Sequence, residues 1–211
     1  MKSIKGEGSV NCPHCDEVFD AEFWTLIRGD ADQELKDSLI GGELNLVSCP
    51  SCGNFFYHER TIIYFDPTIE LLAFVWGGKE EDFEKQKSQM QKDFELLKNN
   101  LTSLNIDYQP FYLKSLAELK AMIEYEDFTR TQSEVIATLA AENKFKVIAL
   151  KPSVARVSGF PFYAPIYKEE YTLENFTKAA TELLKQNSAL NMLKVMLDEV
   201  KKTSKLPAAL K

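Results

Sequence analysis

The sequence predicts an α+β fold, in which an antiparallel β-sheet with an inserted helix comes first and a helical extension follows. Short runs before residue 78 alternate apolar and polar residues, which is the period of half-buried strands. After residue 80, apolar residues recur three and four positions apart over longer stretches, which is the period of amphipathic helices. The 211 residues, 45% of them hydrophobic and 27% charged, are enough for one large or two small globular domains.

The strand-rich part begins with the alternating residues that include Phe19, Phe23 and Ile27. The strands predicted here cover residues 18–27, 44–48, 54–65 (as one strand or two) and 69–76, and a short helix covers residues 30–40. The Gly41-Gly42 pair supplies the stop signal of that helix. The Asp66-Pro67 dipeptide marks a turn, so we expect residues 54–65 and 69–76 to include a hairpin.

The second part is predicted to be mainly helical. Helices are expected over residues 80–101, 173–186 and 189–202, and two more begin at the capping-box residues Ser115 and Thr131. Residues 106–113 are expected to form a strand, residues 145–150 a strand or a buried connector, and residues 152–167 a loop. We predict two domains, residues 1–142 with the sheet and its trailing helices, and residues 143–211 as the helical extension.

Two matching motifs, Cys12-Pro-His-Cys15 and Cys49-Pro-Ser-Cys52, contain the four cysteines of the chain. Two intervening residues allow both thiolates of a tight turn to bind one ion, and two such turns close a tetrahedral site. The residue after each motif often needs a positive φ, which Gly53 adopts freely and Asp16 tolerates. We therefore predict one structural Zn²⁺ held by Cys12, Cys15, Cys49 and Cys52 in a zinc-ribbon-like sheet.

The sequence resembles the bacterial CpXC domain over roughly residues 8–142. The resemblance rests on the paired Cys-Pro-x-Cys turns, the acidic helix with its Gly-Gly-Glu-Leu-Asn-Leu exit, and the aromatic strand ending in Tyr64-Phe-Asp-Pro67. It implies a zinc domain and no particular reaction. Asp16 stands where such turns often have glycine, and the segment after Asn143 lies outside the resemblance.

Other roles for the cysteines remain open at this stage. A redox pair normally precedes a helix, whereas strand-like or turn-like residues follow both motifs. Sulfur ligands alone do not distinguish zinc from iron or an iron–sulfur cluster. The histidines His14 and His58 are alternative ligands, although four cysteines already complete a tetrahedron.

Charge and motif content narrow the classes of function. Residues 1–78 contain 5 Lys/Arg and 13 Asp/Glu, a balance that disfavours nucleic-acid binding. No apolar run reaches the roughly 20 residues of a membrane span, and no secretory signal is apparent, so we expect a cytoplasmic protein. The sequence has no HExxH, GxSxG or GxxxxGK[ST] motif, and a closed tetrathiolate site leaves no position for a catalytic water.

The expected role is therefore a zinc-stabilised module that binds a protein partner or self-associates. The alternatives are an enzyme whose site lies between the sheet and the C-terminal helices and, with less support, a nucleic-acid-binding zinc ribbon. Phe160, Phe162 and Tyr163 form an aromatic, proline-stiffened segment that is either a binding element or part of the core.

Overall fold

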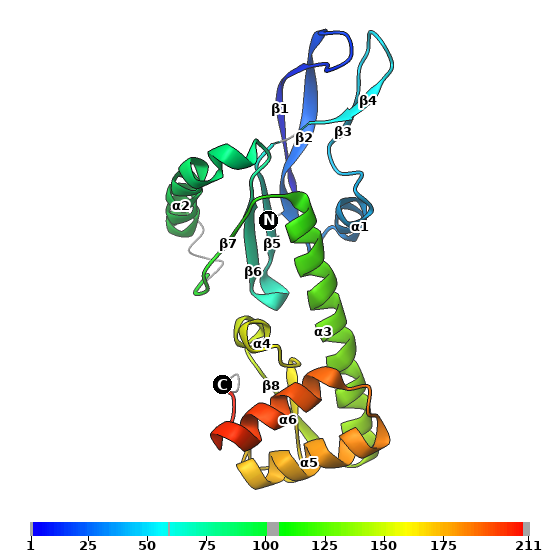
Figure 1. Ribbon diagram of the computed structural model, residues 1–211, viewed down its shortest axis with the longest axis vertical. Helices are drawn as coiled ribbons and strands as arrows, with labels where there is room; N and C mark the ends of the chain where they lie inside the picture. The colour runs from blue at the N-terminus through cyan, green and yellow to red at the C-terminus, as the bar shows by residue number, and fades with distance from the viewer. Residues whose placement is uncertain (1, 59, 101–105, 209–211) are drawn as a thin grey trace. The chain divides into compact units, whose positions relative to one another are not determined.

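The computed structural model describes residues 2–58, 60–100 and 106–208, and it shows an α+β fold (Figure 1). The chain forms two compact units, Met1–Met122 and Ile123–Lys211, and the boundary between them falls within helix α3 (Leu116–Glu142). The predicted division into residues 1–142 and 143–211 stays a prediction. None of the described helices is both long and apolar enough to cross a membrane.

The first unit is built on a five-stranded sheet with the strand order β1-β2-β5-β6-β7. Its strands are β1 (Ile4–Asn11), β2 (Val18–Arg28), β5 (Ile62–Asp66), β6 (Leu71–Val75) and β7 (Phe111–Leu113). The β1/β2 and β5/β6 pairs are antiparallel, as predicted, and β5 and β6 form the predicted hairpin. The β2/β5 and β6/β7 pairs are parallel, because long crossover connections join the strands of each pair.

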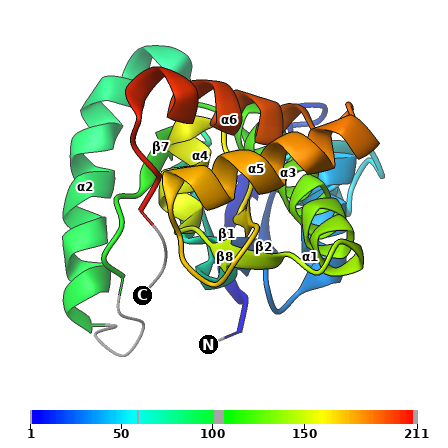
Figure 2. The same cartoon turned by 90° about the horizontal axis from the view of Figure 1, so that it is seen from below.

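Two helices flank this sheet on opposite sides (Figure 2). Helix α1 (Gln33–Gly41) ends at Gly42, whose φ of 77° confirms the predicted stop signal. Helix α2 (Phe83–Asn100) follows the short 3₁₀ helix η2 (Glu80–Asp82). The contact between α2 and the sheet buries an apolar cluster of Phe65, Leu72, Phe74, Met90, Phe94 and Ile106.

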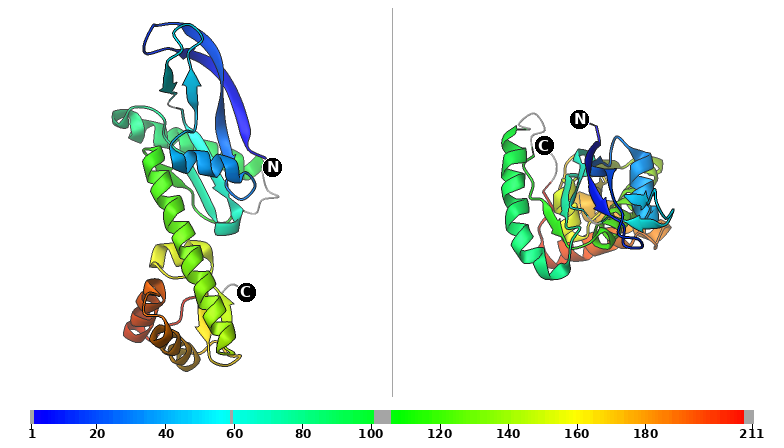
Figure 3. Two further views of the ribbon diagram at one scale, coloured as in Figure 1. Left: turned by 90° about the vertical axis from the view of Figure 1, so that its right-hand side faces the viewer. Right: turned by 90° about the horizontal axis from the view of Figure 1, so that it is seen from above.

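A second, smaller sheet consists of the antiparallel pair β3 (Leu46–Ser48) and β4 (Phe55–Tyr57). The hairpin lies alongside the far ends of β1 and β2 (Figure 3). Val47 on its inner face joins Val10 and Phe23 in a buried cluster. Phe56 contacts Phe19 edge-to-face, with ring centroids 6.3 Å apart. We call these two paired hairpins, residues 6–27 and 43–58, the ribbon.

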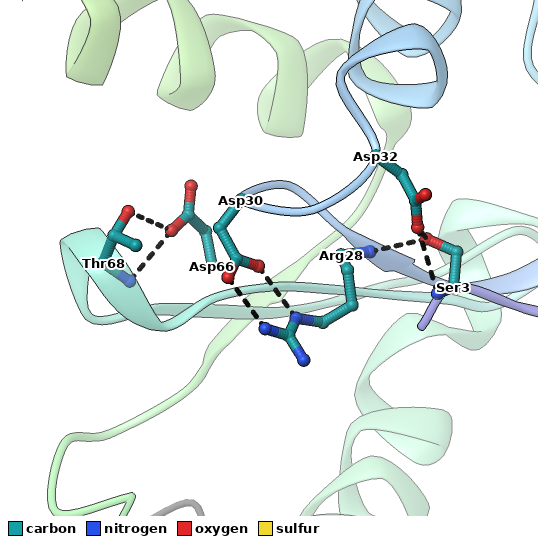
Figure 4. Close-up of polar contacts among 6 residues, drawn as sticks. All are labelled: Ser3, Arg28, Asp30, Asp32, Asp66 and Thr68. Atoms are coloured by element: carbon teal, nitrogen blue, oxygen red, sulfur yellow. Dashed lines mark hydrogen bonds and ion pairs between the residues drawn. The ribbon is translucent and has the colours of Figure 1, made fainter. Parts of the chain in front are cut away.

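The opposite end of β2 is anchored by charged and hydroxyl groups (Figure 4). Nε and Nη2 of Arg28 each donate to a carboxylate oxygen of Asp30 at 2.8 Å, and this hydrogen bonding lowers the pKa of Asp30. Ser3 Oγ accepts a hydrogen bond from Arg28 N at 2.9 Å and donates one to Asp32. These contacts tie the start of the chain and the approach to α1 to the same strand.

The prediction of two helices beginning at Ser115 and Thr131 is wrong, because α3 runs unbroken from Leu116 to Glu142. Ser115 does cap the helix, since its Oγ accepts from Glu118 N at 3.3 Å. Thr131 instead donates its hydroxyl to Asp127 O, one turn back along the same helix, at 3.0 Å. No Gly or Pro interrupts residues 116–142, so the capping signal at Thr131 has no helix end to satisfy.

The second unit also departs from the prediction of a loop over residues 152–167. Helix α4 (Pro152–Ser158) begins at a proline and ends at Gly159 with a φ of 67°, both of which are common helix-terminal signals. Strand β9 (Tyr163–Ile166) then pairs antiparallel with β8 (Lys146–Ala149).

The last two helices agree closely with prediction. Helix α5 covers Leu173–Gln186 and α6 covers Asn191–Thr203. The core of this unit contains Ile136, Ala140, Leu150, Phe160, Ala164, Phe176, Ala180, Leu183, Leu190, Leu193, Met196, Leu197 and Val200.

Candidate metal centre

The first cysteine motif forms the tight turn between β1 and β2. Cys12 N donates to Glu17 O at 2.8 Å, and Asp16 N donates back to Cys12 O at 3.0 Å. Asp16 has a φ of 58°, as expected for the residue after Cys15. The turn therefore places both thiols of the motif on one side of the hairpin end.

The second motif repeats this hydrogen-bond pattern between β3 and β4. Cys49 N donates to Asn54 O at 2.9 Å, and Gly53 N donates to Cys49 O at 2.9 Å. Gly53 has a φ of 71°, which a glycine adopts without steric cost. The two turns are thus equivalent in backbone structure, although they are separated by more than 30 residues.

The four predicted ligand atoms come together at the end of the ribbon. All four Sγ atoms lie within 4.8 Å of one another, with Cys12–Cys52 at 3.7 Å and Cys15–Cys49 at 3.6 Å. Cys12 and Cys49 are buried, whereas Cys15 and Cys52 are exposed, and all four are free thiols. Four sulfur atoms at this spacing can bind one metal ion.

The backbone around the cluster is suited to negatively charged sulfur. Hydrogen bonds from the N–H groups of Cys52 and Ser51 lower the pKa of the Cys49 thiol to about 7. At Cys15 a backbone hydrogen bond at Glu17 acts in the same direction, but partial desolvation and hydrogen bonds with the neighbouring thiols outweigh it and raise the pKa to about 12. Four adjacent thiolates therefore need a cation to balance their charge.

Neither histidine belongs to the four-residue cluster found among the described residues. The side chain of His14 is exposed, and its backbone N–H donates to Cys12 Sγ at 3.4 Å. The ring of His58 packs against Phe23 with centroids 4.4 Å apart, and His58 Nε2 accepts from Arg60 Nε at 3.0 Å. His58 is thus engaged in packing and hydrogen bonding within the ribbon.

Asn45 positions the second turn against the first, and the sequence analysis did not identify it. Its Oδ1 accepts from Trp24 N at 2.8 Å and its Nδ2 donates to Trp24 O at 3.1 Å, so the side-chain amide substitutes for a neighbouring strand. Asn45 also has a φ of 58°, which asparagine tolerates better than most residues. An asparagine three residues after the Gly42 helix end was the available signal.

Replacing Asn45 with alanine is expected to lower the free energy of unfolding by about 1–3 kcal/mol. The substitution removes two hydrogen bonds to Trp24 and leaves alanine in a left-handed conformation. Asn45→Gly, which removes the same amide but relieves the φ, should lose less. Urea unfolding followed by tryptophan fluorescence measures both changes, and an Asn45→Ala protein within about 0.5 kcal/mol of the parent would contradict this role.

The aromatic segment, for which the sequence left open a binding role or a place in the core, lies in the second unit. Phe160 is buried in the core at 7% exposure, and Phe162 and Tyr163 are half-buried. Phe162 N donates to the hydroxyl of Ser133 at 2.8 Å, and Tyr163 begins β9. A binding role for these residues stays a prediction.

Comparison with known families agrees with this geometry. A family model described as CpXC protein matches residues 10–131, which includes both cysteine turns and the whole ribbon hairpin pair from Val10 onward. The match ends inside α3, earlier than the predicted limit at residue 142. No curated protein and no solved structure matches the chain. Because the match covers more than half of the sequence, the chain belongs to the CpXC protein family.

Proposed function

We propose that the four cysteines hold one Zn²⁺ whose role is structural. In a tetrahedral site with Zn–S bonds of about 2.3 Å, neighbouring sulfur atoms lie about 3.8 Å apart. The observed 3.6 and 3.7 Å agree with that spacing. Thiolate ligation also fits the reducing cytoplasmic location expected from the sequence.

A structural role follows from the closed ligand set. Four thiolates complete the preferred coordination of zinc, so no ligand position remains for substrate or a catalytic water. The ion would join two hairpins whose shared apolar cluster is small. Elemental analysis and X-ray absorption of the protein purified under reducing conditions should find one zinc per chain, whereas iron or no metal would contradict the proposal.

The function that the ribbon supports best is binding of another protein, and one observation carries this proposal. In the register Leu46↔Tyr57 and Ser48↔Phe55, Ser48 and three large apolar residues face outward from the β3–β4 hairpin. The apolar residues are Leu46, Phe55 and Tyr57. Their exposures are 41%, 65% and 56%. A contiguous exposed apolar surface on a small hairpin, next to the metal turn, is characteristic of an interaction site. We call these three residues the hairpin face.

The charge of the ribbon indicates which partner this face fits. Residues 6–27 contain five Asp/Glu and residues 43–58 contain one, and neither range contains Lys or Arg. A tetrathiolate zinc centre adds a further charge of about −2. We therefore propose a protein segment that combines basic residues with one or two apolar anchors. The same charge disfavours nucleic acid and a second copy of the ribbon.

Site-specific photo-crosslinking tests this proposal in cells of the source organism. The full chain carries p-benzoylphenylalanine at Phe55, and a matched control carries it at Leu96, which is 60% exposed on α2. The expected result is a dominant crosslink from position 55, but not from position 96, to a Lys/Arg-rich segment of one protein. Affinity for that segment should fall at least about tenfold in Phe55→Ser and weaken with added salt.

Three results would count against a basic protein partner. Identical crosslinks from positions 55 and 96 would show that the hairpin face does not bind a partner specifically. A crosslink to an acidic segment or to the ribbon of a second copy would contradict the charge argument. A crosslink from position 55 to nucleic acid that weakens with added salt would contradict the proposal and support nucleic-acid binding instead.

A further inference from the structure

A pocket of about 580 Å³ lies in the first unit, beside the ribbon and independent of the metal centre. It opens where the parallel strands β6 and β7 end, next to Trp76 and Ser115. Ligands of α/β sheets are commonly found outside the carboxyl ends of parallel strands. The volume is also within the range of about 300–1,000 Å³ that is usual for small-molecule sites.

The walls of the pocket are mainly apolar and aromatic. Leu44 and Tyr57 enter from the ribbon, Trp76 from the end of β6, and Leu116 and Ala117 from the first turn of α3. The Trp76 side chain is held by a hydrogen bond from Nε1 to Lys79 O at 2.8 Å. Such walls suit a planar apolar body.

Gly77, which lines the pocket, lies where two backbone segments come very close together. A Cβ on Gly77 would lie 2.1 Å from the carbonyl carbon and oxygen of Arg60. Gly77 therefore allows the chain leaving β6 to approach the backbone of Arg60, just before β5, and Arg60 is one of the residues that line the pocket.

The charged groups of the pocket differ in how they are paired. Lys114 Nζ forms an ion pair with Glu80 at 2.9 Å, and Glu118 accepts from Lys114 N at 2.8 Å. Arg60 Nε donates to His58 Nε2, and its Cζ lies 5.0 Å from the centroid of the Phe23 ring. The guanidinium also lies against Gly8 on β1, where an added Cβ would be 2.1 Å from Nη2. Within the described part of the chain, no carboxylate pairs with this guanidinium. Among the described residues, this acidic unit thus has at the pocket an arginine that no carboxylate pairs with.

We propose that this pocket binds a small molecule with an aromatic body and one anionic group, such as an aryl carboxylate, sulfonate or phosphate. The aromatic body packs against Trp76 and Leu116, and the anionic group is bound by Arg60. The first turn of α3 adds N–H groups that favour the same charge.

Two matched fluorescent probes test the proposal on the full, zinc-loaded chain. They are 8-anilinonaphthalene-1-sulfonate and N-phenyl-1-naphthylamine, which share an aromatic body and differ in the sulfonate. In a Trp24→Phe background, Trp76 is the single tryptophan, and energy transfer from it to either probe reports binding near the pocket. Arg60→Gln should weaken the sulfonate at least about tenfold and leave the neutral probe within about twofold. The exposed Arg130, replaced by glutamine, is the matched control and should change neither.

A second variant keeps the test decisive if Arg60→Gln perturbs the ribbon. Ala117 is exposed on α3, so Ala117→Trp fills the pocket without removing a core side chain. It should abolish energy transfer to both probes. Equal binding of both probes to Ala117→Trp and to the parent would overturn the site. Equal binding of the sulfonate to Arg60→Gln and to the parent would overturn the anionic class of ligand.

Discussion

Replacing Cys12 with serine is expected to weaken zinc binding by more than about a hundredfold and to unfold the end of the ribbon. Removing a residue that only hydrogen-bonds to a metal ligand already lowers metal affinity about 10–100-fold. Cys12 is predicted to bind the metal directly, so its loss should cost more. Its side chain is also fully buried, so the loss affects packing as well. The binding free energy of a structural zinc contributes directly to folding, by about 10–16 kcal/mol in zinc-finger peptides.

The effect should be local, and this determines how it is measured. The five-stranded sheet has its own buried residues, including Tyr64, Leu72 and Phe74, which do not depend on the metal. Hydrogen exchange should therefore accelerate in residues 8–24 and 44–58 of Cys12→Ser and remain slow in β5 and β6. Competition with a chromogenic chelator gives the change in zinc affinity.

His14→Ala is the matched control for this experiment, because His14 lies in the same turn and its side chain is exposed. It should retain zinc and the exchange pattern of the parent. Zinc loss in His14→Ala, or unchanged zinc affinity in Cys12→Ser, would contradict the tetrathiolate assignment.

Replacing Arg156 with methionine is expected to destabilise the second unit by about 3–5 kcal/mol. Arg156 Nε donates to Glu126, and the two side chains are only 8% and 2% exposed. Removing the guanidinium leaves a buried carboxylate without its cation, which costs far more than the loss of an exposed ion pair. Denaturant unfolding followed by far-ultraviolet circular dichroism measures the change.

Two further variants separate charge from packing. The double variant Glu126→Leu with Arg156→Met removes both charges and should recover most of the lost stability. Arg130→Met removes an exposed arginine from α3, the helix that carries Glu126, and should stay within about 0.5 kcal/mol of the parent. A single Arg156→Met protein as stable as this control would show that the buried pair contributes little.

The candidate metal site was predictable from the sequence because its signals are local. Each turn carries its own ligand spacing, its own proline and its own residue for a positive φ, and Asp16 and Gly53 have that conformation. Asn45 was missed because its role depends on Trp24, a residue 21 positions away on another strand. The charged pair of Glu126 and Arg156 was missed for the same reason, since neither residue is unusual in its own segment.

By itself the sequence determined the α+β class, the four clustered cysteines, and the bounds of helices such as α5, because hydrophobic period and capping residues act over a few positions. Only the tertiary structure decided that β2 pairs with β5 and β6 with β7 in parallel, and that α3 continues past Thr131. Strand direction depends on where a long connection returns to the sheet. Helix continuation depends on whether a stop signal is present, and a capping motif alone does not supply one.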